Sequence, residues 1–366
     1  MLFLNRLADK LFSSYQDRSL QARLSTRNQL KVLNKLNWFV AVLSAAIGAI
    51  FILLYYLPLH AFEKLFNSCV IEITIFGIHA NVFWLKLLDL SVLTFAELYC
   101  LGVINVVAIQ RMAWLLDFPK KEMVDFNLHK KNLSLISLEK KQKQELELGM
   151  DPFYGMSKMY MYLMLIIYKL KAVMSNFIIK LILRRFASRY VLKLFIDLAA
   201  MPIYAFWNAW VSCKIFSKAK YYIFSVQLTE TLAANLAKQN ENESIKFQLE
   251  GLLSFLVMLK RDFSEINYYY SLRMINAIGT EIKRVKPYFD VTNDGEDNQL
   301  DTLFLLFAAG VILDGNISYR ERKYIKTLLK SMEEPPLILL EIDVFLSKYK
   351  EGKAIEFLNA KGYSIN

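Results

Sequence analysis

The chain has 366 residues, of which 55% are hydrophobic and 22% are charged, and its formal net charge is +11. This length accommodates a membrane part together with one or two soluble parts, since a domain commonly takes about 100–200 residues. The positive charge does not indicate nucleic acid, because no nucleic-acid-binding motif accompanies it and many of the cations lie beside apolar runs. Cations in that position mark the cytosolic side of a membrane and attract anionic headgroups. We therefore expect the lipid bilayer as a partner and no nucleic acid.

A run from Leu36 to Ala61 without any formal charge follows a basic leader, residues 1–35. A bilayer core about 30 Å thick needs roughly 20 apolar residues in a helix, so this run is long enough to cross it. Ser44 and Gly48 are four residues apart within the run, a spacing that allows close approach of the next span. The leader has leucines at helical spacing, which predicts an amphipathic helix, either on the inner membrane surface or packed on the cytosolic part.

A second span is predicted from about Leu88 to Gln110, so that residues 36–110 form a transmembrane hairpin. The connection that follows, residues 111–155, is rich in lysine and is therefore expected in the cytosol. The loop at about residues 60–86 then lies outside, and both termini are expected on the cytosolic side of a bacterial cytoplasmic membrane. The lysines of the connection include Lys120, Lys121, Lys130, Lys131, Lys140, Lys141 and Lys143.

The second span contains two acidic residues and an asparagine. Glu97 is near its centre, Asp89 toward its outer end and Asn105 toward its inner end. An ionisable group at such a depth costs several kcal/mol, so it faces a partner, a cavity or water, and it is by default a functional-site hypothesis. The alternative is a protonated Glu97 that is hydrogen-bonded to another helix and holds the helices together.

A second apolar pair is predicted over residues 156–218. Its first arm, Met156–Leu183, carries lysines at intervals of eleven residues, which suits a helix at the membrane interface. Its second arm, Phe195–Cys213, has Asp197 as its one charge and is interrupted by Pro202. We expect this pair to form a membrane-embedded or interfacial hairpin, so that only the first hairpin provides two membrane spans. The alternative is a bundle of four spans.

The remaining chain has the composition of a soluble, cytosolic helical bundle. Helical periodicity covers residues 219–289, and the consecutive Tyr268, Tyr269 and Tyr270 cannot share one helix face, so at least one is expected to be exposed or at an interface. An acidic linker begins at Asp290 and introduces the last domain, residues 290–366. No alternating run requires a sheet, so the fold class is predicted to be all-α.

The last domain contains an alanine-rich helix followed by a short turn and a second helix. Asp314 and Gly315 suit the turn, and Ser318 with Glu321 three residues later predicts a capping box, in which each side chain satisfies a free backbone N–H of the other residue. The pattern Asp-Gly-x-Ile-Ser-x-x-Glu-Arg resembles the signature of TerB-like domains, small helical bundles named for tellurite resistance.

This resemblance covers residues 301–330 and extends at most to Asn366. It implies a cytosolic helical module in stress-response or envelope-linked systems, with acidic residues proposed to bind a divalent metal. Asp314 and Glu321 match those acidic positions. The family usually has Ala-Asp-Gly, whereas Leu313 precedes Asp314 here. The structural alternative is that both acids serve the turn and the helix cap. No other cofactor is expected.

No catalytic residue is predicted. The three histidines are scattered, and the chain has neither a phosphate-binding glycine loop nor a nucleophile elbow. The leading hypothesis is therefore a non-enzymatic membrane protein that anchors a TerB-like module and recruits a protein partner or a second copy. The rival hypothesis is a transporter or channel in which Glu97 lines a polar pathway.

Overall fold

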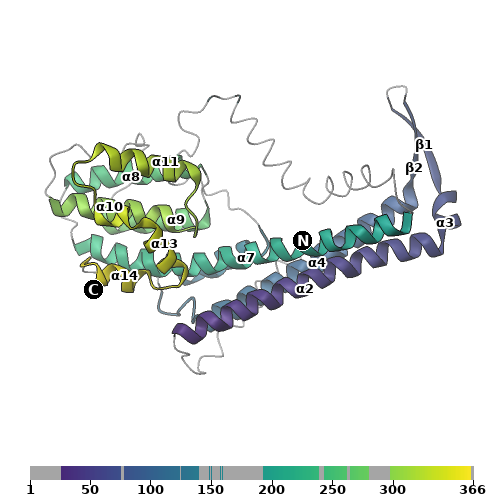
Figure 1. Cartoon of the computed structure of the whole chain (residues 1–366), viewed down its shortest axis with the longest axis horizontal. Helices are drawn as coiled ribbons and strands as arrows, with labels where there is room; N and C mark the ends of the chain where they lie inside the picture. The colour runs from purple at the N-terminus through teal and green to yellow at the C-terminus, as the bar shows by residue number, and fades with distance from the viewer. Residues whose placement is uncertain are drawn as a thin grey trace. The chain divides into compact units, whose positions relative to one another are not determined.

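The computed structural model is predominantly helical (Figure 1). It describes residues 26–75, 78–123, 125–139, 148, 150, 157, 159, 193–238, 243–261, 264–279 and 297–363. The leader, the lysine-bearing arm Met156–Leu183 and the first part of the acidic linker lie largely or wholly outside these residues. The predicted all-α class is confirmed apart from one β-hairpin.

The chain divides into two compact units. Unit 1 comprises residues 1–138 and 162–217, and unit 2 comprises residues 139–161 and 218–366. Helix α7 (Lys193–Lys238) contributes residues to both units. Pro202 lies inside this helix and does not end it, so the expected interruption of the second arm is wrong. Helices tolerate such a proline where neighbouring groups satisfy the carbonyl that it frees.

Unit 1 is built on three long helices: α2 (Thr26–Ala61), α4 (Trp84–Leu115) and the first half of α7. The helices α2 and α4 pack against each other as the two arms of the predicted hairpin. Both are long and apolar enough to cross a membrane. The short helix α5 (Phe126–Ser137) packs on α4 and buries His129 and Leu133.

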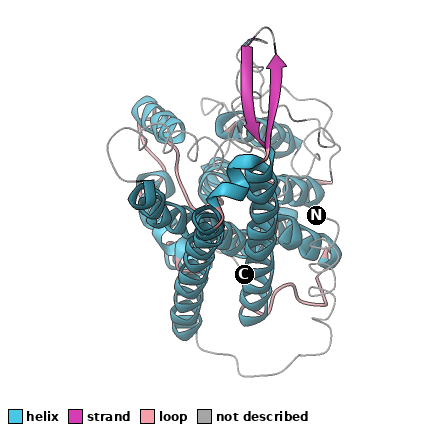
Figure 2. Cartoon of the chain, turned by 90° about the vertical axis from the view of Figure 1, so that its right-hand side faces the viewer, coloured by secondary structure: helices cyan, strands magenta, loops and turns pink. Residues whose placement is uncertain are grey.

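The connection between α2 and α4 contains regular structure that was not predicted. Helix α3 (Glu63–Ser68) leads into strand β1 (Val70–Ile75), which pairs antiparallel with β2 (Ile78–Phe83), and Figure 2 shows the resulting hairpin. The register pairs Val70 with Phe83 and Ile75 with Ile78. Isoleucine, valine and threonine favour extended backbone, and this was the signal that could have revealed the strands.

Unit 2 is a helical bundle around a central helix, α10 (Asp297–Ile312). All residues from Leu303 to Leu313 are buried, as expected for a helix that is apolar on every side. The start of α10 also shows that the end of the predicted acidic linker is helical. The other elements are the end of α7, α8 (Glu243–Lys260), α9 (Glu265–Ile278), α11 (Tyr319–Ser331), α12 (Leu337–Leu340), α13 (Ile342–Lys350) and α14 (Ala354–Ala360).

At least one of the three consecutive tyrosines of α9 was expected to be exposed or at an interface, and the structure shows that Tyr268, Tyr269 and Tyr270 are all buried. Their hydroxyls explain how this is possible. Tyr270 donates to the carbonyl of Leu306 in α10 at 2.8 Å, and Tyr269 donates to Glu230 in α7. Buried tyrosines commonly satisfy their hydroxyl in this way, so α9 can be covered on several sides without an unpaired donor.

Gly315 makes the turn after α10 possible for two reasons. Its φ of +76° lies in the left-handed region, and a Cβ placed on it would lie 2.3 Å from the ring of Tyr221 in α7. Gly279, which caps α9, also has a positive φ (+66°) but has open space around the Cβ position. Substitution of Gly279 therefore tests the energetic cost of the left-handed conformation alone, whereas substitution of Gly315 also tests the cost of a clash with Tyr221.

We expect Gly315→Ala to lower the melting temperature of the full chain more than Gly279→Ala does. Both substitutions incur the left-handed penalty of about 1–2 kcal/mol, but only the alanine at residue 315 also displaces the Tyr221 ring. Thermal unfolding of the detergent-solubilised protein, followed by circular dichroism, measures the difference. Equal losses for the two variants would mean that the close approach of Gly315 to Tyr221 is wrong.

Candidate functional site

The predicted intramembrane residue Glu97 has a partner on a third helix. The side-chain amide of Asn208 in α7 donates to Glu97 Oε1 at 2.7 Å. Asn208 is almost fully buried. The sequence analysis did not identify this partner, because the helix containing it was expected to be interrupted at Pro202. A polar residue at 208, with a second at 212 on the same helical face, was the signal that could have revealed it.

A second polar contact lies one helical turn away. Ser44 of α2 donates to the hydroxyl of Ser212 at 2.9 Å, and both serines are buried. Gly48 of α2 lies against α7 as well: a Cβ on Gly48 would come within 2.7 Å of Asn208 Nδ2 and 3.1 Å of the carbonyl of Tyr204. Ser44 and Gly48 thus contact α7, a partner that was not expected, while α2 also packs against the next span, α4.

The other two polar residues of α4 do not join Glu97 in one cluster. Asp89 and Asn105 each lie eight residues from Glu97, which corresponds to about 12 Å along a helix. Asn105 is buried, and neither its Oδ1 nor Asp89 Oδ2 has a hydrogen-bond partner among the described residues. The unit therefore contains one paired carboxyl group near the middle of α4, with separate polar groups above and below it.

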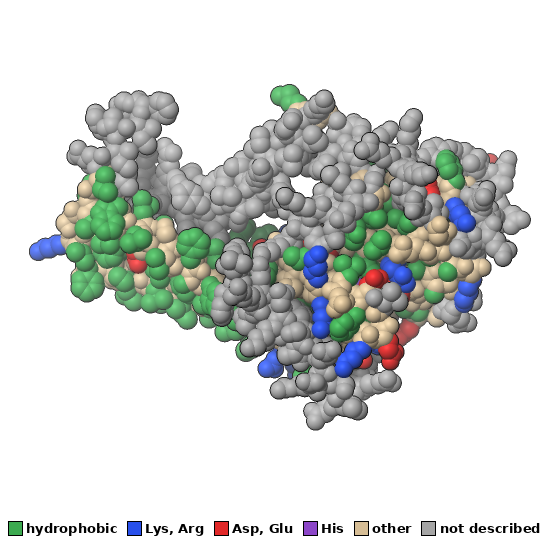
Figure 3. Space-filling model, turned by 180° about the vertical axis from the view of Figure 1, so that it is seen from behind, with side chains coloured by type: hydrophobic (Ala, Val, Ile, Leu, Met, Phe, Trp, Pro, Cys, Tyr) green, Lys and Arg blue, Asp and Glu red, His purple; other side chains and the backbone are tan. Residues whose placement is uncertain are grey.

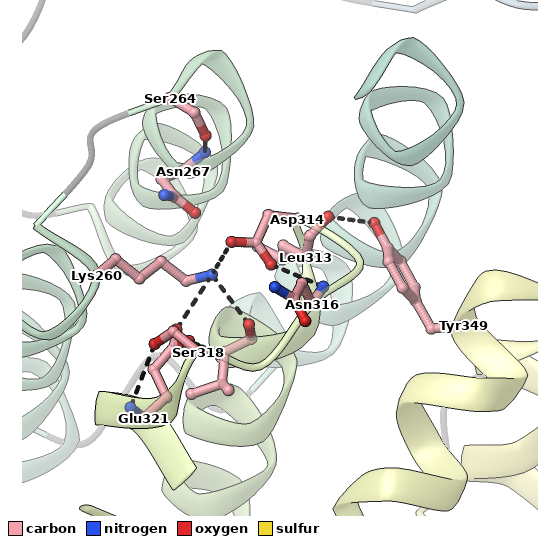
Figure 4. A network of polar contacts seen from close by, with 10 residues as sticks. Lys260, Ser264, Asn267, Leu313, Asp314, Asn316, Ser318, Glu321 and Tyr349 are labelled. Carbon is pink, nitrogen blue, oxygen red and sulfur yellow. Dashed lines mark hydrogen bonds and ion pairs between the residues drawn. The ribbon is translucent and has the colours of Figure 1, made fainter. Parts of the chain in front are cut away.

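Unit 2 brings the two predicted metal-ligand candidates together around a lysine (Figure 4). The Nζ of Lys260, at the end of α8, lies 3.2 Å from Asp314 Oδ2 and 3.5 Å from Glu321 Oε1. The same ammonium donates to the carbonyl of Val311 at 2.9 Å. The side chains of Lys260 and Glu321 are only 5% and 2% exposed, whereas that of Asp314 is 43% exposed. Lys260 is the residue of this group that the sequence analysis missed.

The predicted capping box is confirmed. The backbone N–H of Ser318 donates to Glu321 Oε2 at 2.6 Å, and the N–H of Glu321 donates to Ser318 Oγ at 3.3 Å. Asp314 Oδ1 accepts from the N–H of Asn316 at 3.1 Å. Each carboxylate thus uses one oxygen for the turn or the cap and turns the other toward Lys260. A divalent metal at these two acids would have to displace the ammonium of Lys260.

Tyr349 of α13 contacts the turn after α10 from the other side. Its hydroxyl lies 2.7 Å from the carbonyl of Leu313 and 2.9 Å from that of Tyr221. Burial raises the pKa of Tyr349 well above its usual value, and nearby Asp314 adds to the shift. The hydroxyl therefore remains a neutral hydrogen-bond donor at all physiological pH values. Lys260 and Tyr349 together hold the turn from two sides.

Comparison with known proteins gives no relative to guide the interpretation. No family model matches the chain, and neither the curated proteins nor the solved structures contain a match. Among the residues that the structure describes, no group of three or more histidine, cysteine, aspartate or glutamate side chains is placed to hold a metal ion. The resemblance to TerB-like domains remains a prediction.

We expect Lys260→Met to lower the unfolding free energy by about 3 kcal/mol, because it leaves the carboxylate of Glu321 buried without its cation. Asp314→Asn should cost less than about 1 kcal/mol, because Asp314 is partly exposed and an exposed ion pair contributes little. Melting temperatures of the solubilised full chain give the order. A Lys260→Met/Glu321→Gln double variant should recover part of the loss. Equal losses for the two single variants would contradict the assignment of Lys260 as the buried counter-charge.

Proposed function

We propose that this chain is an integral membrane protein that holds a TerB-like helical module at the inner face of a bacterial cytoplasmic membrane. In this proposal the protein is a non-enzymatic scaffold in a stress-response or envelope-linked system, and both termini are cytosolic. The module recruits a protein partner or a second copy of the chain. The observation that carries the proposal is an inverted distribution of side chains in unit 1: large apolar side chains are exposed, whereas several polar side chains are buried.

The inverted distribution is plain on α2 and α4. Only 22% of the most apolar part of each helix is buried, whereas the apolar core helix of a soluble protein is mostly buried. Trp38 is 70% exposed and Phe95 is 75% exposed, while Ser44 is fully buried. Figure 3 shows apolar side chains covering the visible surface of these helices. Such a surface is unfavourable in water and suits contact with lipid acyl chains.

The distribution of charge supports the orientation. Lys31 and Lys35 lie in the first part of α2, and Arg111 lies near the end of α4, so the same end of the hairpin carries the cations. The connection after α4 adds more lysines. An excess of lysine and arginine beside the membrane faces the cytosol. The loop that contains the β-hairpin would then be extracytoplasmic.

The scaffold role is supported by how unit 2 uses its polar groups. Glu321, Lys260 and Tyr349 all serve internal contacts that hold the turn after α10. In contrast, α12 and α13 leave an apolar face exposed, formed by Leu337, Leu340 and Val344. We call these three residues the α12–α13 face. An exposed apolar group of this kind is typical of a surface that contacts another protein.

We expect Leu340→Asp to reduce the recovery of cross-linked species by the tagged full chain, because a charge in the α12–α13 face disfavours burial against a partner. Cross-linking in membranes, followed by purification and quantitative mass spectrometry, measures the recovery of partner proteins and of a second copy. Lys326→Asp is the control, since it places the same side chain at an exposed position on α11. Equal recovery from the wild type and both variants would argue against this face as the recruiting surface.

A second function, transport along a pathway lined by Glu97, is favoured by the row of polar groups inside unit 1. Glu97→Gln is the sharpest test, because a glutamine carbonyl still accepts from Asn208 and the helices stay together. Under the scaffold proposal, ion or proton flux into reconstituted vesicles is the same for the wild type, Glu97→Gln and Asp89→Asn. A flux that the wild type supports and Glu97→Gln abolishes would replace the scaffold proposal with the transport one.

A further inference from the structure

The first half of α7 carries an apolar face that nothing in the described part of unit 1 covers. Ile203, Phe206 and Trp210 are 40%, 68% and 48% exposed, and their spacing of three and four residues places them on one side of the helix. Asn208 and Ser212, which contact α4 and α2, lie on the other side. The polar groups of this segment therefore face the helices and its large apolar groups face outward.

The contacts also fix the direction of α7 relative to α2. Ser44 meets Ser212, and one turn later Gly48 meets Asn208 and Tyr204. As residue numbers rise along α2, they fall along α7, so the two helices run antiparallel. The bond between Asn208 and Glu97 places the middle of α4 at the same level.

The positions of the helix ends relative to the level of Asn208, Gly48 and Glu97 follow from counting residues along each helix. Lys193 begins α7 and lies fifteen residues before Asn208, which is about 22 Å along a helix. Ala61 ends α2 and lies thirteen residues after Gly48, which is about 20 Å. Trp84, at the start of α4, lies about 20 Å from Glu97. The start of α7 is thus level with the end of the hairpin that carries α3 and the β-strands.

We propose that the first half of α7, from about Phe195 to Cys213, is a further membrane crossing whose exposed face contacts lipid acyl chains. The proposal rests on the proposed membrane location of α2 and α4, which also expose large apolar side chains. The segment is long enough to cross, and Asp197 is its one charged residue. Lys214 follows this segment at the end opposite Lys193, which in this proposal faces the cytosol.

The proposal changes the expected topology. Lys193 lies on the outer side, together with the loop between α2 and α4, and the chain enters the cytosol again through α7. A crossing in the first half of α7 therefore replaces the expected membrane-embedded or interfacial second arm.

Labelling of single cysteines in intact cells tests the proposal. The three native cysteines are replaced by serine, and one reporter is placed at Ser68, at Lys193 or at Lys326. A membrane-impermeant maleimide should label the reporters at 68 and 193 in intact cells and the reporter at 326 only after permeabilisation. Labelling of 68 but not of 193 in intact cells would overturn the further crossing and leave the membrane anchor standing. If 68 also requires permeabilisation, the proposed orientation fails as well.

A nitroxide label at residue 206 provides a second test that does not depend on cells. In phosphatidylcholine vesicles, a label on Phe206→Cys should collide more often with oxygen, which concentrates in the bilayer, than with a water-soluble nickel complex. A label on Lys326→Cys should show the reverse preference. The same preference for the nickel complex at both positions would place the face in water and overturn the proposal.

Discussion

In each unit, one carboxyl group pairs with a polar side chain on a helix that is distant in sequence. In unit 1, Glu97 accepts a hydrogen bond from Asn208 of α7, and in unit 2, Glu321 faces Lys260 of α8. A carboxyl group without a partner is costly both in a protein interior and in a bilayer. Each of these two pairs therefore favours one alignment of two helices that are distant in sequence.

The two units differ in what holds the rest of their helices together. Unit 2 has a central apolar helix, α10, whose burial supplies the hydrophobic stabilisation of a soluble bundle. In a bilayer the surroundings are as apolar as the side chains, so close packing and polar contacts between helices become more important. The contact of Ser44 with Ser212, and the absence of a side chain at Gly48, are features of this second kind.

The sequence was informative wherever a pattern has a local cause. Hydrophobic runs predicted α2 and α4, and the Ser318–Glu321 spacing predicted a capping box that is present with both hydrogen bonds. It was uninformative wherever the partner is remote. No local pattern identifies Lys260, and the polar residues 208 and 212 indicate a polar face of α7 without showing which helix it contacts, because these roles depend on helix packing.

Two errors have the same origin in local reasoning. Pro202 was treated as an interruption because a proline removes a backbone donor, yet α7 continues through it. At least one of the consecutive tyrosines was expected to be exposed or at an interface because the three cannot share one helix face, yet α9 is covered on several sides. Both expectations treated a helix in isolation, whereas the hydroxyls of Tyr269 and Tyr270 find their partners on neighbouring helices.

The turn at Asp314 and Gly315 has a consequence for the chemical lifetime of the protein. Among aspartates, one that precedes glycine is especially prone to rearrange to isoaspartate, through attack of the glycine amide nitrogen on the aspartate side chain. Here the N–H of Gly315 donates to the carbonyl of Ile312 at 2.8 Å, and the Asp314 carboxylate is held by Lys260 and by the N–H of Asn316. The Gly315 nitrogen and the Asp314 carboxylate are thus both held in other contacts, so we expect isoaspartate to form slowly at this site in the folded chain. Isoaspartate at residue 314 would accordingly be a chemical record of molecules in which this turn had opened.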